Sequence, residues 1–467
     1  MAILPDALIR SLQGLPGFDA AAFTTVHAQE APVTSIRLNP QKAFSSQHIT
    51  SNLPALQAGP QPERIPWSSQ GYYLPLRPSF TLDPLFHAGA YYVQEASSMF
   101  LEEVVGATLD VKEPLRVLDL CAAPGGKSTL LQSLLSPESI LVSNEVIKTR
   151  VNILAENISK WGAANVIVTN NDPRDFQRLG AYFDLVVVDA PCSGSGLFRK
   201  DPEAINEWSE ANVVLCSQRQ QRILADVMPA LKEGGILIYS TCSYSPEEDE
   251  AIGDWLCAEF GMTGLQVPIE AQWGIVETVS EKHKAPGYRF YPDKLKGEGF
   301  FIAAFRKTSG GETVKTPGTK HKTGSDSVSK KELEVLRPFL REPDRYFFIR
   351  QQDQLIALPA GREDDLRILQ SSLYIRKAGV RMGTVIREEL VPEHELAVST
   401  LINATVPGFD VDETTALDYL RREAIRIDTE FKGWALLRFT GLPLGWIKML
   451  GNRINNYYPA SWRILNK

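Results

Sequence analysis

Two cysteines lie in turn-forming segments that each follow a short apolar run. Cys192 lies within Asp189-Ala190-Pro191-Cys192-Ser193-Gly194, after the run 183–188, and Cys242 lies within Ser240-Thr241-Cys242-Ser243, after the run 235–239. In a parallel α/β sheet the carboxyl ends of the strands share one crevice, so we expect the two thiols to meet around one ligand. One thiol in such a crevice suggests a nucleophile. Two suggest a covalent intermediate that must be made and then dismantled.

A small-residue turn earlier in the chain suits a nucleoside ligand. Cys121-Ala122-Ala123-Pro124-Gly125-Gly126-Lys127 follows a strand-like run and opens a helix. Small residues let the backbone approach a ligand closely, and amides at the helix start can face it. The spacing is neither G-x-G-x-x-G nor G-x-x-x-x-G-K-[ST], so it does not imply a pyrophosphate.

Acidic residues end the next two strand-like runs. Glu145 is placed to accept ribose hydroxyls, and Asp172 is placed to meet an adenine amino group. A lone glycine turn with one acid would be read as a plain strand–helix connection. Three consecutive strand ends with such residues predict a nucleoside site instead.

The elements that must position these residues alternate between strands and helices. We expect strands at 116–120, 140–145, 165–169, 183–189 and 235–239, and helices at 127–135, 148–161, 218–231 and 247–260. Strands separated by helical stretches of this length predict a doubly wound, mainly parallel α/β sheet. We interpret the acidic run 247–250 as a helix first turn, favourable with the helix dipole.

The flanking regions predict further domains. We expect an N-terminal α+β extension (1–90) with a strand at 34–40, a catalytic domain (91–306) that opens with a helical pattern at 91–99, and a Gly/Ser/Thr-rich linker (307–330). A small intermediate domain (331–390) and a β-rich module (391–467) follow. From residue 431 onward the chain has basic but no acidic residues, interleaved with aromatics. This composition suits RNA contacts and equally suits an ordinary small-domain core with a solvated edge.

Composition limits the function classes. The chain of 467 residues carries a net charge of −7, which taken alone argues mildly against nucleic-acid binding. No apolar stretch approaches a membrane span and no leader pattern opens the chain, so we expect a cytoplasmic protein. The five cysteines lack any C-x-x-C pair, which disfavours both zinc and a disulfide framework. Cys216 and Cys257 lie amid apolar residues and are expected to be buried and inert, as is Cys121 on the same grounds. No role is assigned to any of the six histidines.

These motifs, in this order, resemble the Sun-type (RsmF-like) RNA cytosine-5 methyltransferases, which use S-adenosylmethionine. The resemblance covers residues 37 to about 305 and includes Tyr92-Val93-Gln94-Glu95-Ala96-Ser97-Ser98-Met99 and Lys296-Gly297-Glu298-Gly299-Phe300-Phe301 besides the motifs above. The segment Gly441-Leu442-Pro443-Leu444-Gly445-Trp446 resembles the PUA-like RNA-binding module of the bacterial RsmF-like branch.

The resemblance implies a Rossmann-like methyltransferase core and a set of residue roles. Cys242 would be the nucleophile and Cys192 the residue that helps release the product, with Lys127 and Asp189 close to the target cytosine. The cofactor would be held by Cys121, Ala122, Ala123, Pro124, Gly125, Gly126, Lys127, Glu145, Arg150, Asp172, Asp189 and Pro191, and no metal is implied. The substrate would be small-subunit ribosomal RNA, free or within the small ribosomal subunit, acted on by a monomer.

Several alternatives stay open at this point. Spacing alone does not decide which thiol attacks, because DNA cytosine methyltransferases use the Pro-Cys residue. Transfer RNA is a rival substrate, and a non-catalytic RNA-binding ribosome assembly factor is a rival function. A cysteine hydrolase is disfavoured because no histidine is suitably placed.

Overall fold

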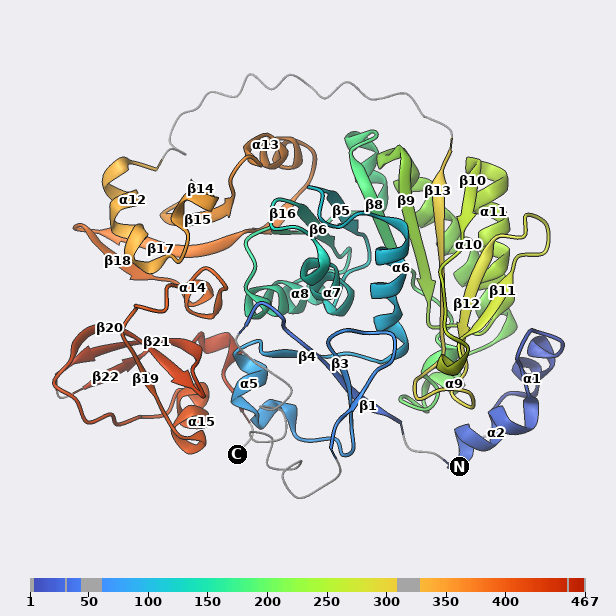
Figure 1. Ribbon diagram of the computed structural model, residues 1–467, viewed down its shortest axis with the longest axis horizontal. Helices are drawn as coiled ribbons and strands as arrows, with labels where there is room; N and C mark the ends of the chain where they lie inside the picture. Colours follow the sequence, from blue (N-terminus) through green and yellow to red (C-terminus); the bar gives the residue numbers. More distant parts are fainter. Residues whose placement is uncertain (1–3, 30–31, 43–60, 309–327, 452, 466–467) are drawn as a thin grey trace.

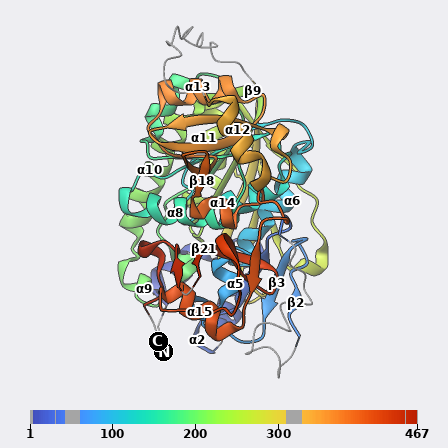
Figure 2. The same cartoon turned by 90° about the vertical axis from the view of Figure 1, so that its left-hand side faces the viewer.

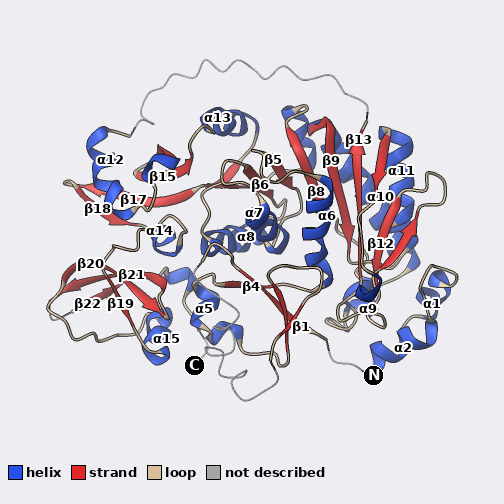
Figure 3. Ribbon diagram, viewed as in Figure 1, coloured by secondary structure: helices blue, strands red, loops and turns tan. Residues whose placement is uncertain are grey.

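The computed structural model describes residues 4–29, 32–42, 61–308, 328–451 and 453–465. A ten-stranded sheet runs through the centre of the molecule, and three four-stranded sheets lie around it (Figure 1). Figure 3 shows the same view with helices and strands coloured separately. Within the described residues, no helix combines the length and the apolar character needed to cross a membrane.

Five parallel strands form the middle of the central sheet. They are β5 (Arg116–Asp119), β6 (Ile140–Asn144), β7 (Val166–Thr169), β8 (Phe183–Asp189) and β9 (Leu231–Thr241). Their order is β9-β8-β5-β6-β7, with every pairing parallel. The strands are apolar on both faces because helices cover both sides of the sheet. The predicted doubly wound core is thus confirmed.

Alternate residues of these strands face two separate cores. Val117 and Val187 pack against α6 (Leu101–Thr108), α7 (Gly126–Leu134) and α8 (Lys148–Trp161). Leu118 and Val186 pack against α10 (Glu210–Val227), α11 (Glu250–Phe260) and α13 (Glu363–Ser372). The strand period of two therefore divides the valines and leucines of each strand between the two helical layers.

Antiparallel strands extend the sheet at both edges. On one side lie β13 (Phe300–Lys307), β12 (Pro286–Phe290), β11 (Val276–Val279) and β10 (Met262–Leu265). On the other side β16 (Ile375–Ala378) pairs with β7. This last strand comes from the predicted intermediate domain, whose remaining strands form their own sheet. That sheet consists of β14 (Tyr346–Gln351), β15 (Gln354–Pro359), β17 (Val380–Ile386) and β18 (Glu389–Pro392).

The N-terminal region and the C-terminal module share one apolar core, although they are far apart in sequence. The N-terminal sheet consists of β1 (Thr34–Leu38), β2 (Glu63–Arg64), β3 (Gly71–Leu74) and β4 (Tyr91–Val93), with α5 (Pro84–His87) beside it. The C-terminal sheet consists of β19 (Gly408–Asp410), β20 (Lys432–Phe439), β21 (Leu442–Leu450) and β22 (Ile454–Asn456), with α15 (Glu413–Arg421). Ile36 and Leu85 belong to the same buried cluster as Tyr419 and Leu444. Figure 2 turns the molecule by 90°, so that the side on the left of Figure 1, which carries the C-terminal sheet, faces the viewer.

Among the described residues, five further α-helices lie outside these layers. The helices α1 (Asp6–Leu12) and α2 (Ala20–Gln29) pack beside the catalytic core, where Phe23 lies edge-on to Tyr244 with ring centroids 5.0 Å apart. The helices α12 (Lys330–Leu336) and α14 (His394–Val398) lie in the C-terminal third, and α9 (Ala204–Glu207) precedes α10. The predicted linker 307–330 falls mostly outside the described residues.

Two element predictions were wrong. The helical pattern predicted at 91–99 begins instead with strand β4, because Tyr92 and Val93 pair with Arg37 and Ile36 of β1. Helical structure starts only at Ser97. The helix predicted at 218–231 begins at Glu210, where the Ser209 hydroxyl accepts a hydrogen bond from the Asn212 amide and caps the first turn.

Candidate active site

The two predicted cysteines lie side by side at the carboxyl edge of the central sheet. Cys192 follows β8 and Cys242 follows β9, and these neighbouring parallel strands end in register at Asp189 and Ser240. The two sulfurs are 2.8 Å apart, and both residues are partly exposed. The crossover topology thus brings together two thiols that are 50 residues apart in sequence. Their roles in catalysis remain predictions.

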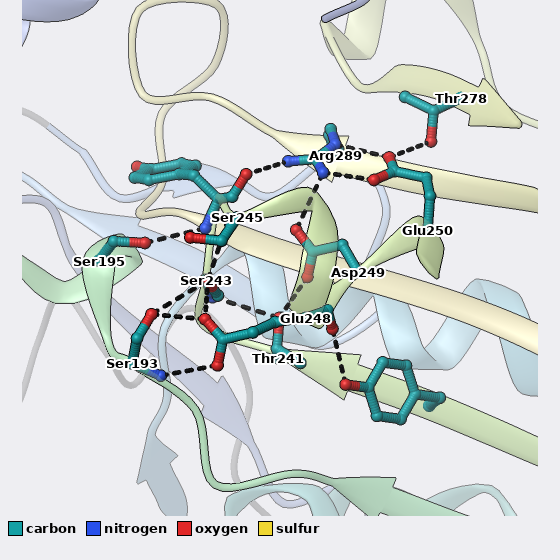
Figure 4. Close-up of polar contacts among 12 residues, drawn as sticks. Ser193, Ser195, Thr241, Ser243, Ser245, Glu248, Asp249, Glu250, Thr278 and Arg289 are labelled. Carbon is teal, nitrogen blue, oxygen red and sulfur yellow. Dashed lines mark hydrogen bonds and ion pairs between the residues drawn. The ribbon is translucent and has the colours of Figure 1, made fainter. Parts of the chain in front are cut away.

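A buried carboxylate, Glu248, holds the two cysteine loops together (Figure 4). Its Oε1 accepts hydrogen bonds from the Ser193 amide at 2.9 Å and from Gln220 Nε2 at 3.0 Å. Its Oε2 accepts from the hydroxyls of Ser193 at 2.5 Å and Ser243 at 2.6 Å. Each of these serines directly follows one of the cysteines, so one carboxylate binds both loops.

Backbone hydrogen bonds that involve two glycines also connect the loops. The Gly196 amide donates to the Cys242 carbonyl at 2.8 Å, and the Gly299 amide donates to the Gly196 carbonyl at 3.1 Å. A Cβ atom on Gly196 would lie 2.4 Å from the Gly299 oxygen and 2.8 Å from the Cys242 oxygen. Only glycine allows the backbones to approach this closely.

Behind the thiols lies a buried ion cluster centred on Arg289. Its Nη2 contacts Asp249 Oδ2 at 3.1 Å and Glu250 Oε2 at 2.5 Å, and its Nη1 donates to the Tyr244 carbonyl at 2.8 Å (Figure 4). Burial raises the pKa of Asp249 well above its ordinary value, even beside this cation. Burial alone would also raise the pKa of Glu250, yet its bidentate pairing with Arg289 lowers that pKa overall.

The acidic run 247–250 is therefore not simply the helix first turn that was predicted. Glu250 does open α11, and Glu247 is exposed, but Glu248 and Asp249 are fully buried. Their partners come from several segments. Glu248 accepts hydrogen bonds from both cysteine loops and from Gln220, and Asp249 accepts the Thr241 hydroxyl and pairs with Arg289. The only available signal was their position directly after Cys242-Ser243-Tyr244-Ser245-Pro246.

Lys127 and Asp189 form an ion pair next to the thiols. Lys127 Nζ lies 2.8 Å from Asp189 Oδ2 and 5.1 Å from the centroid of the Phe300 ring. The Ser240 hydroxyl donates to Asp189 Oδ1 at 2.8 Å. Burial alone would lower the pKa of Lys127, yet Asp189, Asp119 and the nearby Cys242 raise it above its ordinary value. Lys127 is therefore a firmly charged ammonium beside Cys242.

The two thiols differ in their surroundings. The hydrogen bond with Cys242, followed by burial, raises the pKa of Cys192 well above its ordinary value. Either sulfur can be the donor in the hydrogen bond between them. Of the cysteines not expected to react, Cys216 is buried, whereas Cys257 and Cys121 are partly exposed rather than buried as predicted. Burial raises the pKa of each of these three thiols.

The small-residue turn 121–126 is pinned by α8. Arg150 Nη2 donates to the Ala123 carbonyl at 2.7 Å, and Asn157 Nδ2 donates to the Pro124 carbonyl at 2.8 Å. The Ala123–Pro124 peptide is cis, and Gly125 caps α7 with a φ of 116°, a conformation that favours glycine. The turn leads directly into α7, whose first amides have no acceptors within the helix.

The predicted acids surround this turn. Glu145 is buried at the end of β6, where Oε1 accepts the Ile147 amide at 2.9 Å and Oε2 lies 3.6 Å from Arg150 Nη1. Asp172 caps the turn after β7 by accepting the Arg174 amide, and 42% of its side chain is exposed. Pro191 is exposed, and its carbonyl accepts Gln220 Nε2 at 3.1 Å.

Asp119, at the end of β5, contacts the helix that follows the turn. It is fully buried, and its Oδ2 accepts the Ser128 hydroxyl at 2.6 Å, while Oδ1 has no hydrogen-bond partner among the described residues. Burial raises the pKa of Asp119 to about 7.

These residues fit a nucleoside cofactor. A sharp turn of small residues, the amides at a helix start and carboxylates after β6 and β7 are the groups that such a ligand uses. Among the residues that the structure describes, no group of three or more His, Cys, Asp or Glu side chains is arranged to hold a metal ion.

Comparisons with known proteins agree with this geometry. The family model of the 16S rRNA methyltransferase RsmB/F matches residues 106–306, the N-terminal domain of 16S rRNA methyltransferase RsmF matches 4–96, and the methyltransferase RsmF PUA domain matches 406–464.

Similar proteins cover nearly the whole chain. Ribosomal RNA small subunit methyltransferase F of Aeromonas salmonicida is 31% identical, over 91% of this chain and 90% of its own length. The protein of the same name from Shewanella loihica is 30% identical, over 91% of this chain and 88% of its own. A methyltransferase homolog protein from Pyrococcus horikoshii has a crystal structure with a TM-score of 0.52 and 30% identity, covering 65% of this chain and all of that one. The chain belongs to the S-adenosylmethionine-dependent 16S rRNA methyltransferase F family, with a Rossmann-like core and a C-terminal PUA domain.

Proposed function

We propose that this protein methylates carbon 5 of a cytidine in 16S ribosomal RNA through a covalent bond between Cys242 and carbon 6 of the base. The observation that carries the proposal is the pair of thiols 2.8 Å apart beside the Lys127–Asp189 ion pair. Family membership supports the RNA substrate, and the two thiols support the covalent route.

Carbon 5 of cytosine is too electron-poor to take up a methyl group unaided. Addition of the Cys242 thiolate at carbon 6 converts the ring into an enamine whose carbon 5 is nucleophilic. A free thiol is only a few per cent ionised at neutral pH, so the site must favour the thiolate. The Lys127 ammonium stabilises a negative charge on the Cys242 sulfur.

Asp189 suits recognition of the base. More than a third of its side chain is exposed, so its carboxylate can accept from the cytosine amino group while it stays paired with Lys127 and Ser240. A hydrogen bond between this carboxylate and a protonated N3 would draw electrons from carbon 6 and favour thiolate attack.

S-adenosylmethionine, held by residues 121–127 with Glu145, Arg150, Asp172, Asp189 and Pro191, supplies an electrophilic methyl group. After carbon 5 is methylated, its proton must leave before the bond between carbon 6 and Cys242 breaks. Cys192 lies beside Cys242 and, as a thiolate, accepts this proton; the electrons of the carbon 5–hydrogen bond form the carbon 5–carbon 6 double bond while the bond from carbon 6 to sulfur breaks and releases Cys242 as a thiolate.

Substitution of each cysteine tests this assignment. Cys192→Ala should accumulate a covalent RNA–protein adduct that survives denaturing gel electrophoresis, and Cys242→Ala should form none. If Cys242→Ala still traps RNA while Cys192→Ala cannot, the two roles are reversed.

The PUA domain and the N-terminal sheet, which share a core, are proposed to bind ribosomal RNA outside the crevice. The target base must be unpaired or flipped out of its helix to reach the thiols. We propose that the protein acts as a monomer in the cytoplasm, where its five unpaired cysteines stay reduced. Bisulfite mapping of ribosomal and transfer RNA from a strain without this protein would show one or more cytidines in 16S rRNA losing methylation. Loss only in transfer RNA would overturn the substrate, and labelled cofactor binding without methyl transfer to any RNA would indicate a non-catalytic assembly factor.

A further inference from the structure

We propose that Glu248 is a positioning residue that holds Cys192 against Cys242, so that its loss slows product release more than adduct formation. The inference rests on the proposed function, because it assigns Glu248 to the release step of that reaction. No contact between Glu248 and the base is needed, since the carboxylate acts through the loop that carries Cys192.

In each hydrogen bond to the Glu248 side chain, the carboxylate is the acceptor and its partner can donate a proton. The Ser193 amide and Gln220 Nε2 are donors only, and both point at Oε1. The Ser243 hydroxyl accepts from the Ser245 amide at 3.0 Å, which leaves its proton free for Oε2. The Ser193 hydroxyl donates to the same oxygen. Four donors therefore converge on one carboxylate.

These bonds restrain the two cysteine loops unequally. The segment around Cys192 depends on Glu248 through both the amide and the hydroxyl of Ser193. Gln220 adds to this restraint because it donates both to Glu248 and to the Pro191 carbonyl. One carboxylate and its glutamine partner thus fix the residues on either side of Cys192.

Cys242 has further supports of its own. It directly follows β9, whose Thr241 hydroxyl donates to Asp249 at 2.7 Å and accepts the Ser243 amide at 3.2 Å. The Cys242 carbonyl accepts the Gly196 amide. Removal of the Glu248 carboxylate should therefore displace Cys192 while Cys242 stays close to its present place.

Burial makes the carboxylate hard to replace. Glu248 is fully buried, and no lysine, arginine or histidine in the described part of the chain forms an ion pair with it. A buried carboxylate without a cation is costly unless hydrogen bonds compensate it. Here the compensating donors are the cysteine loops themselves, so the carboxylate and the loops hold one another in place.

The test uses two substitutions at Glu248. Glu248→Ala removes all four bonds. Glu248→Gln retains an oxygen for the Ser193 amide and Gln220, and its amide group can donate to both serine hydroxyls, so it keeps the bridge without the charge. Glu247→Ala is the matched control, because Glu247 is the adjacent acid and its side chain is exposed. The full chain, S-adenosylmethionine and a 16S rRNA transcript are mixed, and adduct formation and release of methylated RNA are followed separately on denaturing gels.

We expect Glu248→Ala to form the adduct at a rate near that of the unaltered protein but to release methylated RNA about tenfold more slowly, or slower still, so that adduct accumulates. Glu248→Gln should recover most of the release rate, and Glu247→Ala should behave as the unaltered protein. A Glu248→Ala protein that releases RNA normally would overturn the inference. Equal defects in the Ala and Gln variants would also overturn it, because the charge rather than the bridge would then matter.

Two further variants separate a failure of the proposed Glu248 role from a failure of the proposed function. If Glu248→Ala does not fold, as judged by its thermal transition, Ser193→Ala removes one of the bridging bonds and should show a smaller build-up of adduct. Normal release by that variant would then count against the inference. Cys192→Ala is run alongside: if it traps no RNA, the proposed function itself fails, whereas trapping by Cys192→Ala with normal release by the Glu248 variants contradicts only the role of Glu248.

Discussion

Replacement of Arg289 by methionine should destabilise the protein strongly and in a pH-dependent way. Arg289 is 1% exposed and pairs with two acids, of which Asp249 is fully buried. Methionine fills much of the same space but leaves both carboxylates without their cation. Removal of one partner from a buried ion pair costs about 3–5 kcal/mol, which lowers Tm by about 6–20 °C for a cooperative unit of roughly 200 residues.

The pH dependence follows from the two carboxyl groups. Without the cation, we expect the folded-state pKa of Asp249 and Glu250 to rise above the unfolded value, because burial is then opposed only by hydrogen bonds such as those from Thr241 and Thr278. Each acid then costs little stability below its unfolded pKa, and the cost grows as the pH rises toward the folded pKa. The loss of stability should thus be smaller at pH 5 than at pH 8.

Scanning calorimetry of the full chain at both pH values measures these effects. Arg306→Met is the control, because Arg306 is an exposed arginine on the neighbouring strand β13. The second substitution Asp249→Asn, added to Arg289→Met, should recover part of the loss by removing one unpaired charge. A loss below about 1 kcal/mol, or an equal loss at both pH values, would refute the reasoning that the cluster is a buried, charge-compensated unit.

Three other variants test the crevice and the sheet edge. Lys127→Met should lower the methyl-transfer rate about 100-fold or more while cofactor affinity stays measurable, because it removes the cation beside Cys242; a normal rate with a normal pH profile would count against that role. Arg150→Ala should weaken S-adenosylmethionine binding about tenfold by freeing the Ala123 carbonyl, as titration calorimetry would show, and unchanged affinity would mean that the turn holds its shape unaided. Asn171→Ala should lower the free energy of unfolding by about 1–3 kcal/mol, because the Asn171 side chain forms hydrogen bonds with both the amide and the carbonyl of Tyr374, where β16 joins β7. An unchanged denaturation midpoint would show that β16 pairs with β7 without this contact.

Much of the fold was predictable from local patterns. Each core strand is a short run of Val, Leu and Ile bounded by turn residues, and each helix between them has a clear apolar spacing, so β5 to β9 and α7, α8 and α11 were found within a few residues. The same order of strands and turns predicts that Cys192, Cys242 and Asp189 lie at one edge of the sheet.

The predictions that failed depended on partners distant in sequence. Tyr91–Val93 is a strand only because β1 lies beside it, and the local sequence Tyr-Tyr-Val has no signal that separates a short strand from a helix start. The pairing of β16 with β7 joins residues about two hundred positions apart, which no local period can show. Glu248 is another example. In the sequence it is one acid in an acidic run, and its burial between the two cysteine loops depends on hydrogen bonds from Ser193 and Ser243, which the tertiary structure brings together.

By itself, then, the sequence determined the layered α/β core and which residue types stand at its strand ends, because backbone periodicity and turn chemistry act over a few residues. Only the tertiary structure decided how far apart the two sulfurs lie, which acids are buried, and which distant segments complete the sheet. Those properties arise from packing and desolvation between parts of the chain that are not neighbours in sequence.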